Sequence, residues 1–64
     1  MSYKAIHIIC DQDLEETISF LLQKSGYEGT SYEKGMLIAY CKAENYKEDE
    51  TLALLANFGL SLEQ

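Results

Sequence analysis

Carboxylates are the residues in this chain whose grouping could support a specific chemistry. Eight of the eleven fall in two short stretches, the first with Asp11, Asp13, Glu15 and Glu16 and the second with Glu44, Glu48, Asp49 and Glu50. Grouped carboxylates can bind a basic protein surface, coordinate a metal ion or imitate nucleic-acid phosphates. Which of these chemistries applies depends on the elements that carry the two stretches.

Composition limits the classes of function. The 64 residues predict a single domain, residues 1–64, near the lower size limit for independent folding. A hydrophobic content of 47% without proline is typical of a folded chain. A net charge of −6 with only five lysines disfavours direct binding to nucleic acid or to an anionic membrane. The expected partner is therefore a basic protein.

Targeting signals are not evident in the sequence. No apolar run approaches the roughly 20 residues that a membrane span requires. Residues 1–10 are too short and polar for a signal peptide. We therefore expect a cytoplasmic protein whose cysteines are reduced.

Three segments have the residue pattern of β-strands, and two of them are expected in the interior of the sheet. Residues 3–10 are rich in isoleucine and predict a central strand covered on at least one side. Residues 27–33 and 36–41, joined by a turn at residues 34–35, predict a hairpin with a polar edge strand and a central second strand. Residues 60–64 leave room for a short last strand. The two faces of the first strand are Ile6, Ile8 and Cys10, and Ala5, His7 and Ile9.

The two acidic stretches have the pattern of helix starts. Asp13 and Glu16 have the spacing of a capping box, which predicts a helix over residues 14–25. Asn45 with Glu48 predicts the start of a second helix that ends at Gly59. Its expected buried face is Leu52, Leu55, Ala56 and Phe58.

The order β-α-β-β-α, with a possible short last strand, predicts a ferredoxin-like split β-α-β domain of the α+β class. We expect an antiparallel or mixed sheet with both helices on one face. In this topology we expect the first and third strands to be parallel central neighbours, so that both helices begin at the same end of the sheet and the acidic stretches form one anionic surface.

Helix stability offers another explanation for the acids, because the macrodipole and capping favour Asp and Glu in a first turn. Two capping boxes need about four acids. Glu15, Asp49 and Glu50 are then the least explained by stability. An EF-hand loop begins with the same Asp-x-Asp pattern as Asp11 and Asp13, but the glycine and glutamate that it needs later are missing, so no metal site is predicted.

Catalytic and cofactor motifs are weak. His7 has no cysteine or carboxylate at motif spacing, and the chain has neither a glycine-rich phosphate loop nor a nucleophile beside a base. We therefore expect no enzyme and no cofactor. Cys10 and Cys41 end the two central strands and could be neighbours, either as reduced core thiols or as a redox pair.

Five tyrosines are many for this length. Tyr40 is expected in the core, and Tyr27, Tyr32 and Tyr46 at edge or loop positions. Exposed tyrosines beside acids suit a protein-binding surface, although sheets are also rich in tyrosine.

The segment from Glu15 to Tyr40 carries Glu-Glu-Thr-Ile-Ser-Phe-Leu-Leu, then Gly-Tyr-Glu-Gly, then Gly-Met-Leu-Ile-Ala-Tyr. It resembles the N-terminal substrate-recognition domain of methyltransferases that modify a ribosomal stalk-base protein. That resemblance implies a fold and a role in docking a protein, and it transfers no catalytic residue. In size, acidity and lack of proline, the chain also resembles phage-encoded inhibitors such as anti-CRISPR proteins, many of which mimic DNA.

Together these features favour a non-enzymatic inhibitor that mimics nucleic acid and occupies a basic groove of a nucleic-acid-binding protein. A protein-docking domain of a larger enzyme is the alternative. A homodimer through the edge strand at residues 27–33 is a further possibility. The expected partner-binding residues are Asp11, Asp13, Glu15, Glu16, Glu44, Tyr46, Glu48, Asp49 and Glu50.

Overall fold

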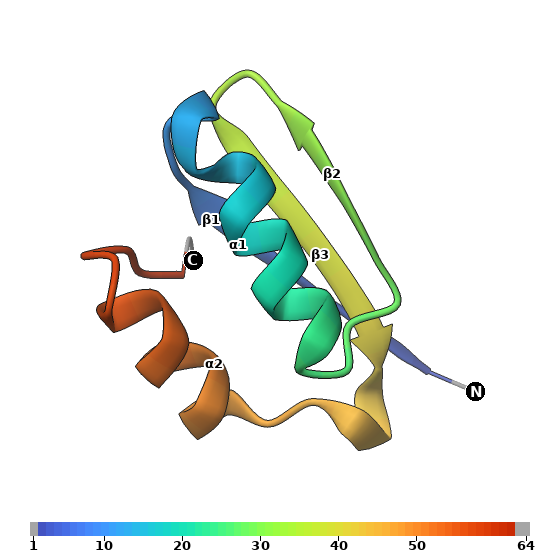
Figure 1. The fold of residues 1–64 in the computed structure, drawn as a ribbon. Coiled ribbons are helices and arrows are strands. Elements are labelled where there is room, and N and C mark those ends of the chain that lie inside the picture. The colour runs from blue at the N-terminus through green and yellow to red at the C-terminus, as the bar shows by residue number, and fades with distance from the viewer. Residues whose placement is uncertain (1, 63–64) are drawn as a thin grey trace.

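A computed structural model describes residues 2–62 and shows an α+β domain (Figure 1). Three strands form one sheet, and two helices lie on one side of it. The elements in chain order are β1 (Tyr3–Ile9), α1 (Gln12–Lys24), β2 (Gly29–Glu33), β3 (Met36–Lys42), the short 3-10 turn η1 (Ala43–Asn45) and α2 (Glu48–Ala56).

The sheet has the order β1-β3-β2, and both of its pairings are antiparallel. Strands β1 and β2 therefore run in the same direction with β3 between them, which is the split β-α-β arrangement that the sequence predicts. The predicted last strand at residues 60–64 lies partly outside the described residues. Within them, Leu62 pairs with Ile8 at the free edge of β1.

The predicted parallel pairing of β1 with β3 is wrong. Helix α1 returns the chain to the end of the sheet where β1 began, so β2 repeats the direction of β1, and the hairpin then reverses the chain into β3. As a result α1 begins at one end of the sheet and α2 begins at the other (Figure 1).

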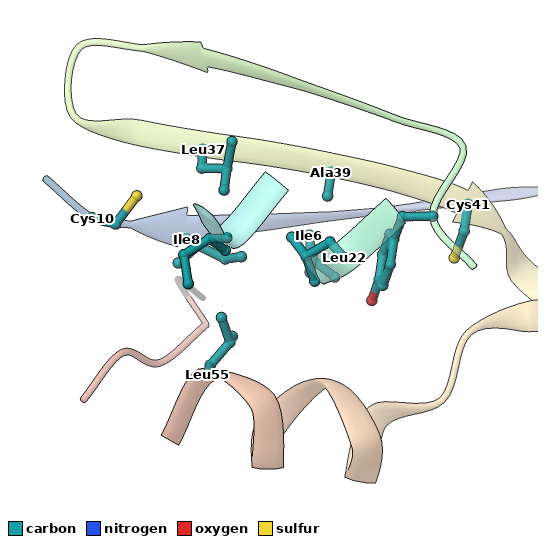
Figure 2. Packing of buried hydrophobic residues seen from close by; sticks show 10 residues of the cluster. Ile6, Ile8, Cys10, Leu22, Leu37, Ala39, Cys41 and Leu55 are labelled. Carbon is teal, nitrogen blue, oxygen red and sulfur yellow. The ribbon is translucent and has the colours of Figure 1, made fainter. Parts of the chain in front are cut away.

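The core lies between the sheet and the helices. Alternate residues of β1 and β3 point toward the helix layer, and Figure 2 shows these side chains facing Leu55 of α2. Each fully buried aliphatic side chain contributes about 1.5–3 kcal/mol of transfer free energy. The largest fully buried side chains are Ile8, Ile18, Leu22, Leu37, Cys41 and Leu55.

The hairpin forms where the sequence predicts it. Lys34 and Gly35 have φ angles of 51° and 79°, the left-handed conformation required at both central positions of a two-residue type I′ turn. Glu33 and Met36 pair directly on either side of it. This turn sets the register of the whole β2–β3 ladder.

Neither predicted capping box forms. The Leu14 N–H donates to the Asp11 carbonyl over 2.9 Å, so α1 begins at Gln12 and Asp11 becomes its N-cap. Asn45 instead belongs to η1, and Lys47 is the N-cap of α2. No side chain makes a capping hydrogen bond at the start of either helix.

Candidate interaction surfaces

The α1 acidic cluster, defined as Asp11, Asp13, Glu15 and Glu16, occupies the first turns of α1. Its members are exposed except Glu15, which is half-buried and accepts a hydrogen bond of 3.3 Å from the Ser19 hydroxyl. Nearby, the Tyr32 hydroxyl donates to the Cys10 carbonyl over 3.0 Å. Part of this cluster is therefore held by contacts within the domain.

The Tyr32 phenol lies close enough to the α1 acidic cluster for the carboxylates to affect its pKa. Desolvation is the main cause that raises the pKa of its phenol; ionisation of the Cys10 thiol at alkaline pH and the carboxylates of Asp11, Glu15 and Asp13 raise it further.

The α2 acidic cluster, defined as Glu44, Glu48, Asp49 and Glu50, is fully on the surface. A carboxylate oxygen of Glu50 lies 3.5 Å from the Lys47 ammonium nitrogen. The lysine side chain is 73% exposed and the glutamate side chain 68%. Such an exposed pair stabilises by only about 0–1 kcal/mol. Three of the four carboxylates have no ion pair among residues 2–62.

Tyr46 lies between Glu44 and Glu48 of the α2 acidic cluster and packs partly against the core. The Lys4 ammonium lies 5.2 Å from the centre of its ring, and burial, followed by the charge of Glu48, raises the pKa of its phenol. Tyr46 is thus half-buried rather than fully available for a partner.

The two acidic clusters do not form one surface. Because β1 and β3 are antiparallel, the first turns of α1 and α2 lie at opposite ends of a molecule whose longest dimension is 32 Å. The single anionic surface predicted from the sequence is corrected to two separate clusters on the helix layer.

Little positive charge offsets the two clusters. Lys4 lies over Tyr46, Lys24 lies 5.3 Å from the ring centre of Phe20, and Lys47 meets Glu50. Apart from Glu15, which is bonded by Ser19, and Glu50, which pairs with Lys47, the first-turn acids stabilise the helices only through the helix dipole, because none makes a capping hydrogen bond.

A groove of about 280 Å³ runs beside β1 and contains a side chain of the α2 acidic cluster. Ammonium, imidazole and carboxylate groups line this groove. The sequence does not reveal this combination, because the lining residues come from β1, the start of α2 and the C-terminal segment. The lining residues are Lys4, Ala5, Ile6, His7, Tyr46, Glu48 and Leu62.

The roles predicted for Tyr27 and Tyr40 are reversed. Tyr27 is buried, and its hydroxyl lies 2.8 Å from the Thr51 hydroxyl oxygen. Tyr40 is 44% exposed because it is in register with Ala5 and Gly29 on the side of the sheet away from the helices. Leu37, Ala39 and Cys41 alternate with these outward residues, but both sets are apolar, so the pattern alone does not identify the covered side.

Cys10 and Cys41 are free and buried. They lie at opposite ends of the sheet, as Figure 2 shows, so of the alternatives left open by the sequence they are separate core thiols and not a pair. The same antiparallel register that separates the acidic clusters separates the thiols.

Residues 2–62 contain no group of three or more His, Cys, Asp or Glu placed to hold a metal ion. In that range, neither helix has the length and apolar character needed to cross a membrane. Comparisons with known protein families, with curated proteins and with solved structures yield no match.

Proposed function

We propose that this chain is a non-enzymatic inhibitor that binds a basic groove of a nucleic-acid-binding protein in place of nucleic acid. The observation that supports this most directly is the α2 acidic cluster. Its carboxylates are exposed, make no capping hydrogen bond, and have a single ion pair within residues 2–62. Charges that the fold does not use remain free to meet a cationic partner.

The local charge density of α2 supports mimicry of phosphates. Glu48, Asp49 and Glu50 are consecutive, so a helical rise of about 1.5 Å per residue separates successive charges along the axis. Duplex DNA carries about one charge per 1.7 Å of its axis. The carboxylates of the first turn of α2 therefore have the spacing of duplex charges along the axis, although the Lys47 ammonium offsets the charge of Glu50.

The α2 acidic cluster is the expected main contact. In the α1 acidic cluster, Glu15 is engaged by Ser19, and Tyr32 packs beside the helix start. Because the clusters lie at opposite ends of the domain, a partner that binds both needs two basic patches separated by most of the 32 Å length.

Charge reversal at the two ends tests this proposal with matched variants. Glu48→Lys, Asp49→Lys and Glu50→Lys together change the net charge from −6 to 0, and so do Asp11→Lys, Asp13→Lys and Glu16→Lys together. The partner is captured from host lysate on the immobilised wild-type chain, and its affinity is then measured for each variant. Circular dichroism checks that both variants fold.

We expect the α2 variant to lose binding and the α1 variant to lose less, although both have the same net charge. Binding should weaken with salt, and added nucleic acid should displace the chain from its partner. Equal affinity of both variants and the wild type, or failure of nucleic acid to compete, would contradict the proposal.

A further inference from the structure

The side of the sheet away from the helices, here called the open face, is unusually apolar. Solvent-facing positions of an antiparallel sheet are commonly polar. Here the outward positions of β1 and β3 include aromatic and long aliphatic side chains, of which Tyr3, Ile9 and Tyr40 are 56%, 58% and 44% exposed. Met36 and Ile38 lie between them. Neither helix lies over this side of the sheet (Figure 1), although the Tyr3 hydroxyl donates to the Glu28 carboxylate over 3.3 Å.

We propose that the open face is a self-association surface on which a second copy of this chain packs sheet against sheet. Charge is the first argument. At its strand positions the open face carries one carboxylate, Glu33, one ammonium, Lys42, and the imidazole of His7, whereas the chain as a whole has a net charge of −6. A basic partner is drawn to the helix layer, but this neutral face offers it no attraction.

Charge complementarity is the second argument and sets the orientation. Glu33 pairs with Met36 at the hairpin end of the sheet, and Lys42 pairs with Tyr3 at the opposite end. A two-fold axis that crosses the strands in the plane between two sheets would place each Glu33 opposite the Lys42 of the other copy. The central rows of each face, Ile38 with His7 and Ser31, and Tyr40 with Ala5 and Gly29, would then meet the same rows of the partner.

The size of the face predicts a weak dimer. Seven residues at about 3.3 Å each and three strands about 4.8 Å apart span a flat area of about 330 Å². Standard interfaces bury about 800 Å² of accessible surface per partner. We therefore expect a dissociation constant in the micromolar range or weaker. The acidic clusters lie on the opposite layer, so dimerisation leaves them accessible.

Sedimentation equilibrium of the full chain from micromolar to millimolar concentration tests the proposal. The expected result is a monomer–dimer equilibrium. Glu33→Lys and Lys42→Glu should each weaken it by about tenfold, because each change creates two like-charge contacts across the symmetric interface. The double variant should restore the wild-type constant. A monomer throughout, or single variants without effect, would overturn the proposal.

Two further variants separate this interface from pairing through the free edge of β2. Ile38→Lys places charge in the middle of the open face and should abolish the dimer. Thr30→Pro removes a backbone N–H that the hairpin register directs toward the outer edge of β2, and it should leave a face-to-face dimer intact. The reverse pattern would assign the contact to the edge and overturn the proposal. If Ile38→Lys does not fold, the exchange of Glu33 and Lys42 decides the question.

Discussion

The two sides of the sheet are built from the same strands but carry different residues for different reasons. On the covered side, Ile8, Leu37 and Ala39 have no exposed surface. On the open face, their neighbours in sequence are aromatic or long aliphatic residues, and Ile9 and Tyr40 are about half exposed, at 58% and 44%. Close packing against the helices selects size and shape on the covered side. It places no such demand on the open face.

This difference shows that apolar character and packing are separate properties of a strand. The alternation in β1 and β3 is weak because both sides are apolar, yet only one side is sealed by α1 and α2 (Figure 2). The fold accounts for the apolar residues of the covered side. Those of the open face need another explanation, which association with a second copy provides.

Leu37 and Ile38 are adjacent on the central strand and face opposite sides, so they test this difference most strongly. Leu37→Ala should lower the free energy of unfolding by about 2–5 kcal/mol, because it leaves a cavity that the core cannot fill. Ile38→Ala removes the same kind of side chain from a half-buried site and should cost about 1 kcal/mol or less at monomer concentrations. Urea denaturation followed by circular dichroism measures both; equal losses would mean that the open face is packed as tightly as the core.

The buried hydrogen bond between Tyr27 and Thr51 joins α2 to the loop before β2 and should have the next largest effect. Tyr27→Phe leaves the Thr51 hydroxyl buried without its partner and should cost about 1–3 kcal/mol. Thr51→Val removes the other partner. A double-mutant cycle in urea should give a coupling of about 1 kcal/mol; a coupling of zero would mean that the bond does not hold α2 in place.

Alkaline pH should loosen the covered side before it affects the open face. Burial raises the pKa of the Cys41 thiol, of the Cys10 thiol and of the Tyr27 phenol. A raised pKa in the folded state means that folding favours the protonated form. The stability contribution is therefore complete below the ordinary pKa range of these groups, about 8.5–10, and is lost as the pH rises through and above that range.

Urea denaturation between neutral and alkaline pH measures this loss. Replacing both cysteines by alanine should reduce the slope of unfolding free energy against pH, although the variant is also less stable at neutral pH. An unchanged slope would assign the loss to the tyrosines, since the pKa values of the Tyr27, Tyr32 and Tyr46 phenols are also raised.

Much of the fold follows from local sequence. The hairpin turn needs residues that accept positive φ, and Lys34-Gly35 supplies them; the apolar positions of residues 36–41 place β3 in the middle of the sheet. The antiparallel direction of β1 and β3 can also be predicted from the sequence, because a split β-α-β unit followed by a hairpin requires β3 to run opposite to β1. A parallel pair would place both helix starts at one end of the sheet and join the acidic clusters into one surface, and both of these predictions are wrong.

Other features depend on contacts that spacing does not determine. The start of α2 is delayed by η1, where the Tyr46 N–H donates to the Ala43 carbonyl over 3.2 Å. The sequence therefore does not distinguish whether Asn45 caps a helix or belongs to a turn. Glu15 with Ser19 has the i, i+4 spacing of an interacting pair, and Lys47 with Glu50 has the i, i+3 spacing, so these contacts can be predicted from the sequence. The sequence does not show which side of the sheet lacks helices.

The smallest expected effect concerns Gly29, where the open face should tolerate a clash that the covered side would not. A Cβ added to Gly29 would lie 2.5 Å from the Tyr40 hydroxyl oxygen. Because this atom is the end of a partly exposed side chain, the Tyr40 ring can rotate away from Gly29. The Tyr40 and Tyr3 ring centres lie 6.3 Å apart, so this rotation would also separate the two rings. Gly29→Ala should thus cost about 1 kcal/mol or less while changing the near-ultraviolet circular dichroism of the tyrosines.

Gly35→Ala is the matched control, since nothing lies within 4 Å of its added Cβ but its φ of 79° is unfavourable for alanine. It should cost about 1 kcal/mol through backbone strain, with the tyrosine signal unchanged. If Gly29→Ala instead destabilised the domain as much as Leu37→Ala does, Tyr40 would be held rigidly on the open face. A rigid ring there would mean that this side of the sheet is already packed within one chain, and the main reason for a second copy to cover it would disappear.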